Sequence, residues 1–304
     1  MPGPIAHERI ELELALRVGP FSIQASLSGV NGPWLTRHDL TRRLGPFIVT
    51  DAKVADSAGP LLQLNATLDD TAWRRDGTRP SRLEVTSSGG LWHLSRSDLV
   101  ATMSQTEQNG WMISGTMTPE GTLVEECLRL MCWMSLMSYG GGLFVHGASS
   151  VRGGRGYCFP AASGTGKSTL VRLTPGDLAL SDEISLLTRD EEGQWWVWPS
   201  PFWNWESAFS STSPIAMKAY PLEALVLLHQ GPAGSEWVAT EASEALASVL
   251  MNVVAFDTLK EGSLKTIDLT IELLEWLEGR DRLGHLYLLK GDDPYCRLET
   301  SWRQ

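Results

Sequence analysis

The stretch that decides the fold runs Ala161-Ala162-Ser163-Gly164-Thr165-Gly166-Lys167-Ser168, followed by Thr169. It fits the looser form of the phosphate-binding loop pattern, with Ala161 where the strict pattern has glycine. The short apolar run 156–159 before it is typical of a strand, and 168–173 after it is typical of a helix. The sequence therefore predicts a strand, a glycine-rich turn and a helix in succession, which is the context in which this motif binds phosphate.

Each residue type in this phosphate loop, residues 161–168, has a physical task. Gly164 and Gly166 let backbone N–H groups converge on a phosphate without a Cβ in the way. Lys167 can reach the outer phosphates of a nucleotide, and the Ser168 hydroxyl can ligate Mg²⁺. The alternative is a Gly/Ser turn with an exposed lysine, which the agreement of spacing and context disfavours. We expect ATP to bind on Ala162, Ser163, Gly164, Thr165, Gly166, Lys167, Ser168 and Thr169.

The composition narrows the class of protein. A chain of 304 residues has room for two modest domains, or for one with an appendage, and 42% hydrophobic residues support a core. The net charge of −11 argues against a sequence-independent nucleic-acid binder. The same acidity fits an ordinary cytosolic enzyme and a preference for basic partners equally well. We expect no nucleic-acid partner, and the sequence leaves open whether the chain forms a homo-oligomer.

The cysteines and the N-terminus bear on location. The cysteines are Cys127, Cys132, Cys158 and Cys296. They form no C-x-x-C pair and have no histidine at zinc spacing, so we expect buried reduced thiols and a reducing, cytoplasmic environment. Residues 1–10 lack an apolar segment after a basic start, and no signal peptide is expected. The most apolar run, 128–137, is too short to span a bilayer, so no membrane association is expected.

The first part of the chain has the pattern of a β-rich module over residues 1–117. Ile10, Leu12, Leu14 and Leu16 alternate with polar or small residues, as in a half-buried strand. Further strands are predicted at 21–27, 47–50, 61–66, 91–94, 100–104 and 110–117. We expect this module either to pack on a nucleotide-binding domain or to hold a substrate.

From residue 118 the pattern changes to mixed α/β, and we predict a nucleotide-binding kinase domain over 118–304. Thr118-Pro119-Glu120 has the composition of a helix start, and apolar residues then recur at helical spacing to Met137. Two more helices are predicted at 241–256 and 264–278. The strands predicted here are 143–145, 156–159, 178–180, 184–188, 194–198, 222–228, 285–289 and 295–298.

Polar residues of three predicted elements converge on the phosphate loop. His146 follows the strand 143–145, and Asp182-Glu183 follows the strand 178–180. Acids at the end of a strand beside a phosphate loop usually hold Mg²⁺. One acid of the pair can therefore ligate the metal with Ser168 while the other accepts the proton of an acceptor hydroxyl, and His146 can hydrogen-bond that acid or the phosphate. Such a histidine or acid pair usually has a structural role when it occurs alone. These residues are site candidates because they occur together with the phosphate loop.

The segments 143–147, 161–168 and 180–183 together resemble the HPr kinase/phosphorylase family, whose nucleotide fold is like that of PEP carboxykinase. The likeness covers about residues 140–230. It implies an α/β fold, with a mixed sheet that carries the phosphate loop and a β-rich N-terminal module. It also implies roles for the site residues: Asp182 as catalytic base, Glu183 as second acid, His146 as active-site histidine, and Lys167 and Ser168 as phosphate and Mg²⁺ ligands.

The departures from that family bear on the substrate. Glu183 stands where the family has a second aspartate, and the glycine-rich signature that contributes to phosphorylase activity is not found. HPr itself and the reverse reaction are therefore not implied. The chain is more similar to shorter HPr-kinase-like proteins that are associated with modified peptides, including kinases of lasso-peptide precursors.

We therefore expect an ATP- and Mg²⁺-dependent kinase for a serine or threonine hydroxyl of a peptide or small protein. Two alternatives remain open, namely a kinase for a small metabolite such as free serine, and a silent nucleotide-binding partner protein.

A tryptophan-rich stretch, residues 195–205, holds five of the 13 tryptophans. It is either a stacking surface for a base or an extended peptide, or a segment packed on the core or on another subunit. The packing interpretation is favoured, since aromatic clusters usually serve burial.

Overall fold

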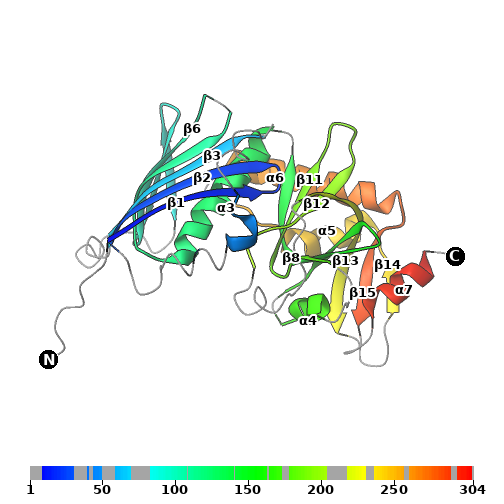
Figure 1. The fold of residues 1–304 in the computed structure, drawn as a ribbon. Helices are drawn as coiled ribbons and strands as arrows, with labels where there is room; N and C mark the ends of the chain where they lie inside the picture. Colours follow the sequence, from blue (N-terminus) through cyan, green and yellow to red (C-terminus); the bar gives the residue numbers. More distant parts are fainter. Residues whose placement is uncertain are drawn as a thin grey trace. The chain divides into compact units, whose positions relative to one another are not determined.

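The fold comes from a computed structural model, which describes residues 9–30, 40, 44–49, 59–69, 83–107, 109–139, 141–162, 164–172, 178–203, 218–230, 236–256, 260–288 and 293–302. The protein is a strand-rich, mixed α/β protein with two sheets, as the sequence predicts at this coarse level (Figure 1). Its residues fall into two compact units, and the division lies between Ser135 and Leu136, within a helix. The boundary expected from the sequence lies ahead of that helix, at residue 118.

The first unit contains a seven-stranded sheet in the order β1-β2-β3-β7-β6-β5-β4. The β2–β3 and β3–β7 pairs are parallel and the other pairs are antiparallel. Its strands are β1 (Arg9–Val18), β2 (Phe21–Val30), β3 (Leu61–Leu68), β4 (Glu84–Ser88), β5 (Leu91–Arg96), β6 (Leu99–Gln105) and β7 (Trp111–Met117).

Strand β1 illustrates why these segments form strands. Ile10, Leu12, Leu14 and Leu16 are buried, whereas Glu11 and Glu13 on the other face are exposed, so the predicted alternation is confirmed. The strand predicted at 47–50 is reduced to an isolated bridge between Ile48 and Leu16, because Phe47 ends the 3₁₀ helix η1 (Gly45–Phe47), which has Pro46 in its first turn. Thr50 lies outside the described residues. Strand β4 is not predicted because it is mostly exposed and lacks apolar alternation.

Helix α3 (Gly121–Tyr139) begins directly after Thr118-Pro119-Glu120, as the sequence predicts. Its residues from 130 to 136 are buried on every side, which fits the apolar composition of this stretch. The chain then leaves the helix through Gly141, whose φ of 102° suits glycine.

The second unit contains an eight-stranded sheet in the order β10-β8-β11-β12-β13-β15-β14, with β9 between β8 and β13. Its strands are β8 (Gly142–Arg152), β9 (Arg155–Pro160), β10 (Leu178–Ser181), β11 (Ile184–Arg189), β12 (Trp195–Trp198), β13 (Tyr220–Gln230), β14 (Glu236–Ala239) and β15 (Leu283–Leu288). Strands β9, β13 and β15 run parallel to one another, so their C-terminal ends share one edge.

The ladders of the second unit close into a cycle. The first half of β8 pairs with β11 and its second half pairs with β9. Strand β12 links β11 to β13, and β13 pairs with β9. The cycle therefore runs β8-β11-β12-β13-β9 and returns to β8.

Helices flank this sheet on both faces (Figure 1). Helices α5 (Ala242–Leu250) and α6 (Lys260–Glu278) contribute Val249 and Leu273 to a core that includes Leu225 of β13. Helices α4 (Lys167–Arg172) and α7 (Pro294–Ser301) contribute Leu170 and Leu298 to a second core, which includes Val226 on the opposite face of β13. Because β13 is buried on both faces, its sequence is a nearly continuous run of apolar residues.

Several expectations for the second unit are wrong in detail. Residues 295–298 lie in helix α7, because Pro294 occupies its first turn and Asp293 accepts a hydrogen bond from the Tyr295 N–H at 2.9 Å. The helix expected over 241–256 ends at Leu250. Strand β8, expected only over 143–145, continues past His146 to Arg152, and the turn to β9 consists of Gly153 and Gly154, with φ of 59° and 78°.

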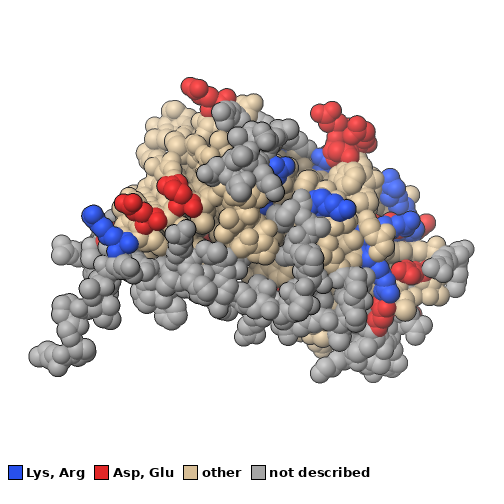
Figure 2. All heavy atoms as spheres, viewed as in Figure 1, with Lys and Arg blue, Asp and Glu red and all other residues tan. Residues whose placement is uncertain are grey.

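The expectation of buried reduced thiols is met for three of the four cysteines. Cys127, Cys132 and Cys158 are buried free thiols, and burial raises the pKa of Cys127 and Cys158 to about 12, but Cys296 is exposed. No helix within the described ranges is long and apolar enough to cross a membrane. On the face seen in Figure 2, basic and acidic side chains of the described residues lie beside one another in several places.

Candidate functional site

The phosphate loop follows β9, whose last residue is Pro160. Gly164 and Gly166 have φ of 83° and 104°, the left-handed region that glycine adopts without strain. A Cβ added at either glycine would meet no atom within 4 Å, so backbone conformation, rather than space within the protein, requires glycine here. Thr165 closes the turn, since its hydroxyl donates to the Ala162 carbonyl oxygen at 2.8 Å. Ser163 lies outside the described residues.

Lys167 is the first residue of α4 and is buried. Its Nζ donates hydrogen bonds to the carbonyl oxygens of Ala161 at 2.7 Å and Ala162 at 2.9 Å. Burial lowers the pKa of Lys167, and the carboxylates of Glu183 and Asp182 partly oppose this shift. The amino group therefore lies over the start of the loop, with two carboxylates near enough to act on its charge.

Ser168 and Asp182 meet in this structure. The Ser168 Oγ donates to Asp182 Oδ2 at 3.3 Å, and Asp182 is only 1% exposed. Asp182 directly follows β10, and the turn after it is fixed because Ser181 Oγ accepts from the N–H groups of Glu183 and Ile184 at 3.3 and 3.1 Å. A hydroxyl and a buried carboxylate from distant parts of the sequence thus form one polar pair.

His146 lies beside this pair through the sheet. It is paired in register with Ile184 of β11, and its carbonyl oxygen accepts from the Ala161 N–H at 3.5 Å. Burial lowers the pKa of His146, the charge of Lys167 lowers it further, and Glu183 opposes both effects. Because this pKa lies below the ordinary value of about 6.5, the imidazole is neutral at pH 7 and keeps one nitrogen as an acceptor.

Gly147 shows why a glycine follows the histidine. A Cβ at this position would lie 2.6 Å from the Phe159 carbonyl oxygen, which is too close for any side chain. Its N–H donates to the Glu183 carbonyl oxygen at 2.8 Å, and its own carbonyl accepts from Ser185 Oγ at 2.9 Å. This position is where β8, β9 and β11 are held together.

The structure therefore brings most of the expected site residues to one place. Hydrogen bonds join Lys167 to the start of the loop and Ser168 to Asp182. The charge of Lys167 lowers the pKa of His146, and the charge of Glu183 raises the pKa of Lys167. Thr169 is exposed next to them.

Gln230 is a site residue that sequence reasoning missed. It ends β13, and its Nε2 donates to the Gly164 carbonyl oxygen at 3.2 Å. Because β13 runs parallel to β9, both strands end at the edge that carries the loop, and Figure 1 shows α4 beside the C-terminal end of β13. The available signal was its position at the end of a predicted buried strand.

The described tryptophans of the stretch 195–205 are packed or hydrogen-bonded. Trp195 is 1% exposed and Trp203 is also buried. The indole N–H groups of Trp196 and Trp198 donate to side chains of the same hairpin at 2.7 and 2.8 Å. Trp205 lies outside the described residues. The packing interpretation therefore holds for the tryptophans that the structure describes.

We expect Trp203→Ala to destabilise the protein rather than to affect substrate binding alone. Truncation of a buried aromatic side chain costs about 3–5 kcal/mol. Thermal unfolding should show a clear fall in Tm, and the matched replacement of the half-buried Trp196 by alanine should lower Tm less. An unchanged Tm together with a raised KM for an acceptor would instead place Trp203 in a binding surface.

Comparison with known proteins gives a match to a protein family. The family described as SynChlorMet cassette protein ScmC matches residues 116–269. This range includes the phosphate loop, His146 and Asp182, and it spans about half of the chain. No curated protein sequence matches the chain significantly.

Proposed function

The chain belongs to the ScmC family of SynChlorMet cassette proteins, and from its site we propose an ATP- and Mg²⁺-dependent kinase that phosphorylates a serine or threonine hydroxyl of a peptide or small protein. The observation that carries this proposal is the hydrogen bond from Ser168 Oγ to Asp182 Oδ2, next to the buried Lys167. Hydroxyl, carboxylate and ammonium are the three groups that phosphoryl transfer from a Mg²⁺-nucleotide requires at one place.

The residues at the site fit Mg²⁺. It prefers oxygen ligands, and it is usually held by one or two carboxylates together with phosphate oxygens and water. Ser168 would supply one such oxygen and Glu183 another, which leaves the Asp182 carboxylate to act as the base. Within the described residues no group of three or more His, Cys, Asp or Glu side chains forms a metal cluster. When bound, Mg²⁺ would neutralise charge on the phosphates.

The other tasks fall to this chain's own groups. Lys167 would transfer its hydrogen bonds from the Ala161 and Ala162 carbonyls to phosphate oxygens of the nucleotide. The Asp182 carboxylate would accept the proton of the acceptor hydroxyl. The oxygen of that hydroxyl would attack the γ-phosphorus, and the bond between the γ-phosphorus and the bridging oxygen of the β-phosphate would break. The neutral imidazole of His146 would orient Asp182 or the phosphate through a hydrogen bond.

A peptide or small-protein acceptor is favoured over free serine. The support is the resemblance of the segments 143–147, 161–168 and 180–183 to HPr-kinase-like proteins, which act on hydroxyls of larger substrates. The chain also carries a separate unit of about 135 residues beyond the one that holds the phosphate loop, and a metabolite kinase does not need such a unit.

The test is phosphate incorporation by the wild-type protein. We expect label from γ-labelled ATP in a subset of serine- and threonine-containing peptides, and no label in matched peptides with alanine at the acceptor position. Excess EDTA should abolish the transfer, because the metal is required. Label in free serine alone would favour a metabolite kinase. ATP binding without transfer to any acceptor would favour a silent nucleotide-binding protein and contradict the proposal.

A further inference from the structure

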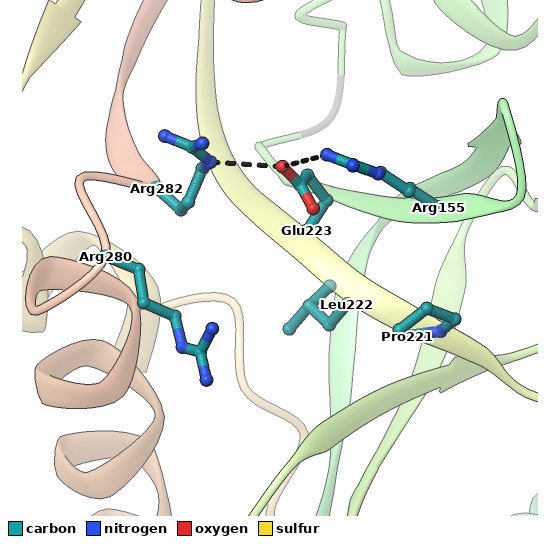
Figure 3. A pocket seen from close by; sticks show the side chains of 6 residues that line it. All are labelled: Arg155, Pro221, Leu222, Glu223, Arg280 and Arg282. Carbon is teal, nitrogen blue, oxygen red and sulfur yellow. Dashed lines mark hydrogen bonds and ion pairs between the residues drawn. The ribbon is translucent and has the colours of Figure 1, made fainter. Parts of the chain in front are cut away.

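A second polar site lies in the same unit as the phosphate loop. It is a cavity of about 510 Å³, lined by Arg155, Pro221, Leu222, Glu223, Arg280 and Arg282 (Figure 3). These residues lie at or next to the N-terminal ends of the parallel strands β9, β13 and β15. The phosphate loop follows the C-terminal end of β9, so this arginine pocket is at the opposite edge of the sheet.

The arginine pocket carries an excess of positive charge. Glu223 Oε1 accepts hydrogen bonds from Arg155 Nη1 at 2.9 Å and Arg282 Nε at 3.1 Å. Figure 3 shows this carboxylate between the two guanidinium groups, with Arg280 outside the pair. One carboxylate among three arginines leaves about two unbalanced positive charges, although the chain as a whole has a net charge of −11.

The backbone places Glu223 in this position. The register of β13 against β9 shifts between Leu222 and Ala224, so Glu223 lies at a β-bulge. A bulge changes the direction in which a side chain points. Here Leu222 remains in the core while Glu223 reaches the two arginines. Arg282 is also held by Trp302, whose ring lies 4.4 Å from its guanidinium carbon. Two of the three arginines are therefore fixed before any ligand arrives.

Arg280 provides a binding group. Its guanidinium carbon lies 4.3 Å from the centre of the Trp276 ring, and no carboxylate among the described residues pairs with it. Stacking occupies the face of a guanidinium and leaves its N–H edge to donate. The side chain of Arg155 is 60% exposed, so its remaining N–H groups are also accessible. Planar N–H forks of this kind match carboxylate and phosphate oxygens.

We propose that the arginine pocket binds a small organic dianion, whose carboxylate or phosphate oxygens accept from Arg280 and Arg155 while its carbon skeleton rests on Pro221 and Leu222. The volume falls within the range of about 300–1,000 Å³ that is usual for small-molecule sites. The negative net charge of the chain opposes the approach of a long polyanion, whereas a small dianion is held by contacts shorter than the screening length. The proposal does not depend on kinase activity.

Calorimetric titration with two organic dianions, succinate and glycerol 3-phosphate, tests the proposal. The titrations use protein with Lys167→Ala, so that phosphate-loop binding does not contribute. Arg280→Ala should weaken the binding of the probe by about tenfold or more, because charge-assisted hydrogen bonds are lost. Glu223→Gln should tighten binding, since a competing carboxylate is removed. Arg189→Ala is the matched control, because Arg189 pairs with Glu272 on the surface of the same unit and does not line the pocket.

Each outcome either supports the proposed anion site or contradicts it. Binding of succinate alone assigns a carboxylate ligand, and binding of glycerol 3-phosphate alone assigns a phosphate ligand. Tighter binding of an acidic hexapeptide than of either probe would overturn the small-molecule assignment. Loss of affinity in Arg189→Ala equal to that in Arg280→Ala, or no binding of any probe, would overturn the site itself. Circular dichroism checks that each variant is folded, and Arg280→Gln replaces Arg280→Ala if the latter is not.

Discussion

Asp182→Asn is expected to reduce phosphoryl transfer by about 10²–10⁴-fold, the usual effect of losing a general base. Asparagine keeps the size of the side chain and can still accept from Ser168 Oγ, but its amide cannot take a proton from the acceptor hydroxyl. The burial of Asp182 leaves little room for water to replace the carboxylate. ATP affinity should change only modestly, because the loop backbone and Lys167 remain.

The measurement pairs phosphate incorporation into an acceptor peptide with calorimetric ATP binding. Asp190→Asn is a suitable control, since Asp190 lies in the β11–β12 hairpin and accepts hydrogen bonds from Trp196 and Gln194 rather than from the phosphate loop. Undiminished transfer by Asp182→Asn would move the base elsewhere, and Glu183→Gln would then be the variant to examine. His146→Ala should cause a similar but smaller loss, because it acts by orienting Asp182 or the phosphate.

Lys167→Ala is expected to weaken ATP binding by about ten- to a hundredfold and to abolish turnover. The loss of charge-assisted hydrogen bonds to the phosphates gives the effect on affinity. The loss of positive charge beside the transferred group gives the effect on rate. The variant also removes two hydrogen bonds to the carbonyls of Ala161 and Ala162, so the start of the loop should become less ordered.

The variant Lys265→Ala separates the loss of phosphate binding from the loss of a lysine–carbonyl hydrogen bond. Lys265 Nζ also donates to a backbone carbonyl oxygen, that of Met137 at 2.6 Å, but it lies on α6 rather than in the loop. A fall in Tm common to both variants measures the lost lysine–carbonyl bond, whereas a loss of ATP affinity in Lys167→Ala alone measures phosphate binding. Normal affinity and turnover in Lys167→Ala would mean that the loop does not hold the nucleotide.

The elements that local patterns encode are the ones that the sequence predicts well. The alternation in β1, the apolar stripe of α3 and the glycine spacing of the loop depend only on neighbouring residues. A strand is expected at 295–298 instead of helix α7 because this segment is short and lacks a continuous apolar stripe, and the cap at Asp293 favours the helix. The length of α5 was overestimated because the bridge between Val145 and Val253, a tertiary contact, replaces helix there.

The residues of the candidate site also differ in how far local sequence indicates them. Lys167 and Ser168 are site candidates from the motif, and Asp182 is one from its place after an apolar strand. The contact of Gln230 with the loop depends on the parallel pairing of β13 with β9, and the sequence near residue 230 indicates only that this residue follows a buried strand. The arginine pocket cannot be predicted from local sequence. Arg155, Glu223 and Arg280 are each more than 50 residues apart along the chain and come together only in the folded sheet.

The closed cycle of ladders has a consequence for where the molecule can open. Strands β8, β9, β11, β12 and β13 have hydrogen-bonded neighbours on both sides, and of the described strands in this unit only β10 and β14 have one. Local opening is easiest at free edges and in loops, and hardest where ladders are complete. The strands that carry His146 and lead into the phosphate loop should therefore exchange their amide hydrogens only when the whole unit unfolds. If the proposed nucleotide binds at the phosphate loop, its binding should change the amide exchange of these strands only through the stability of the whole unit.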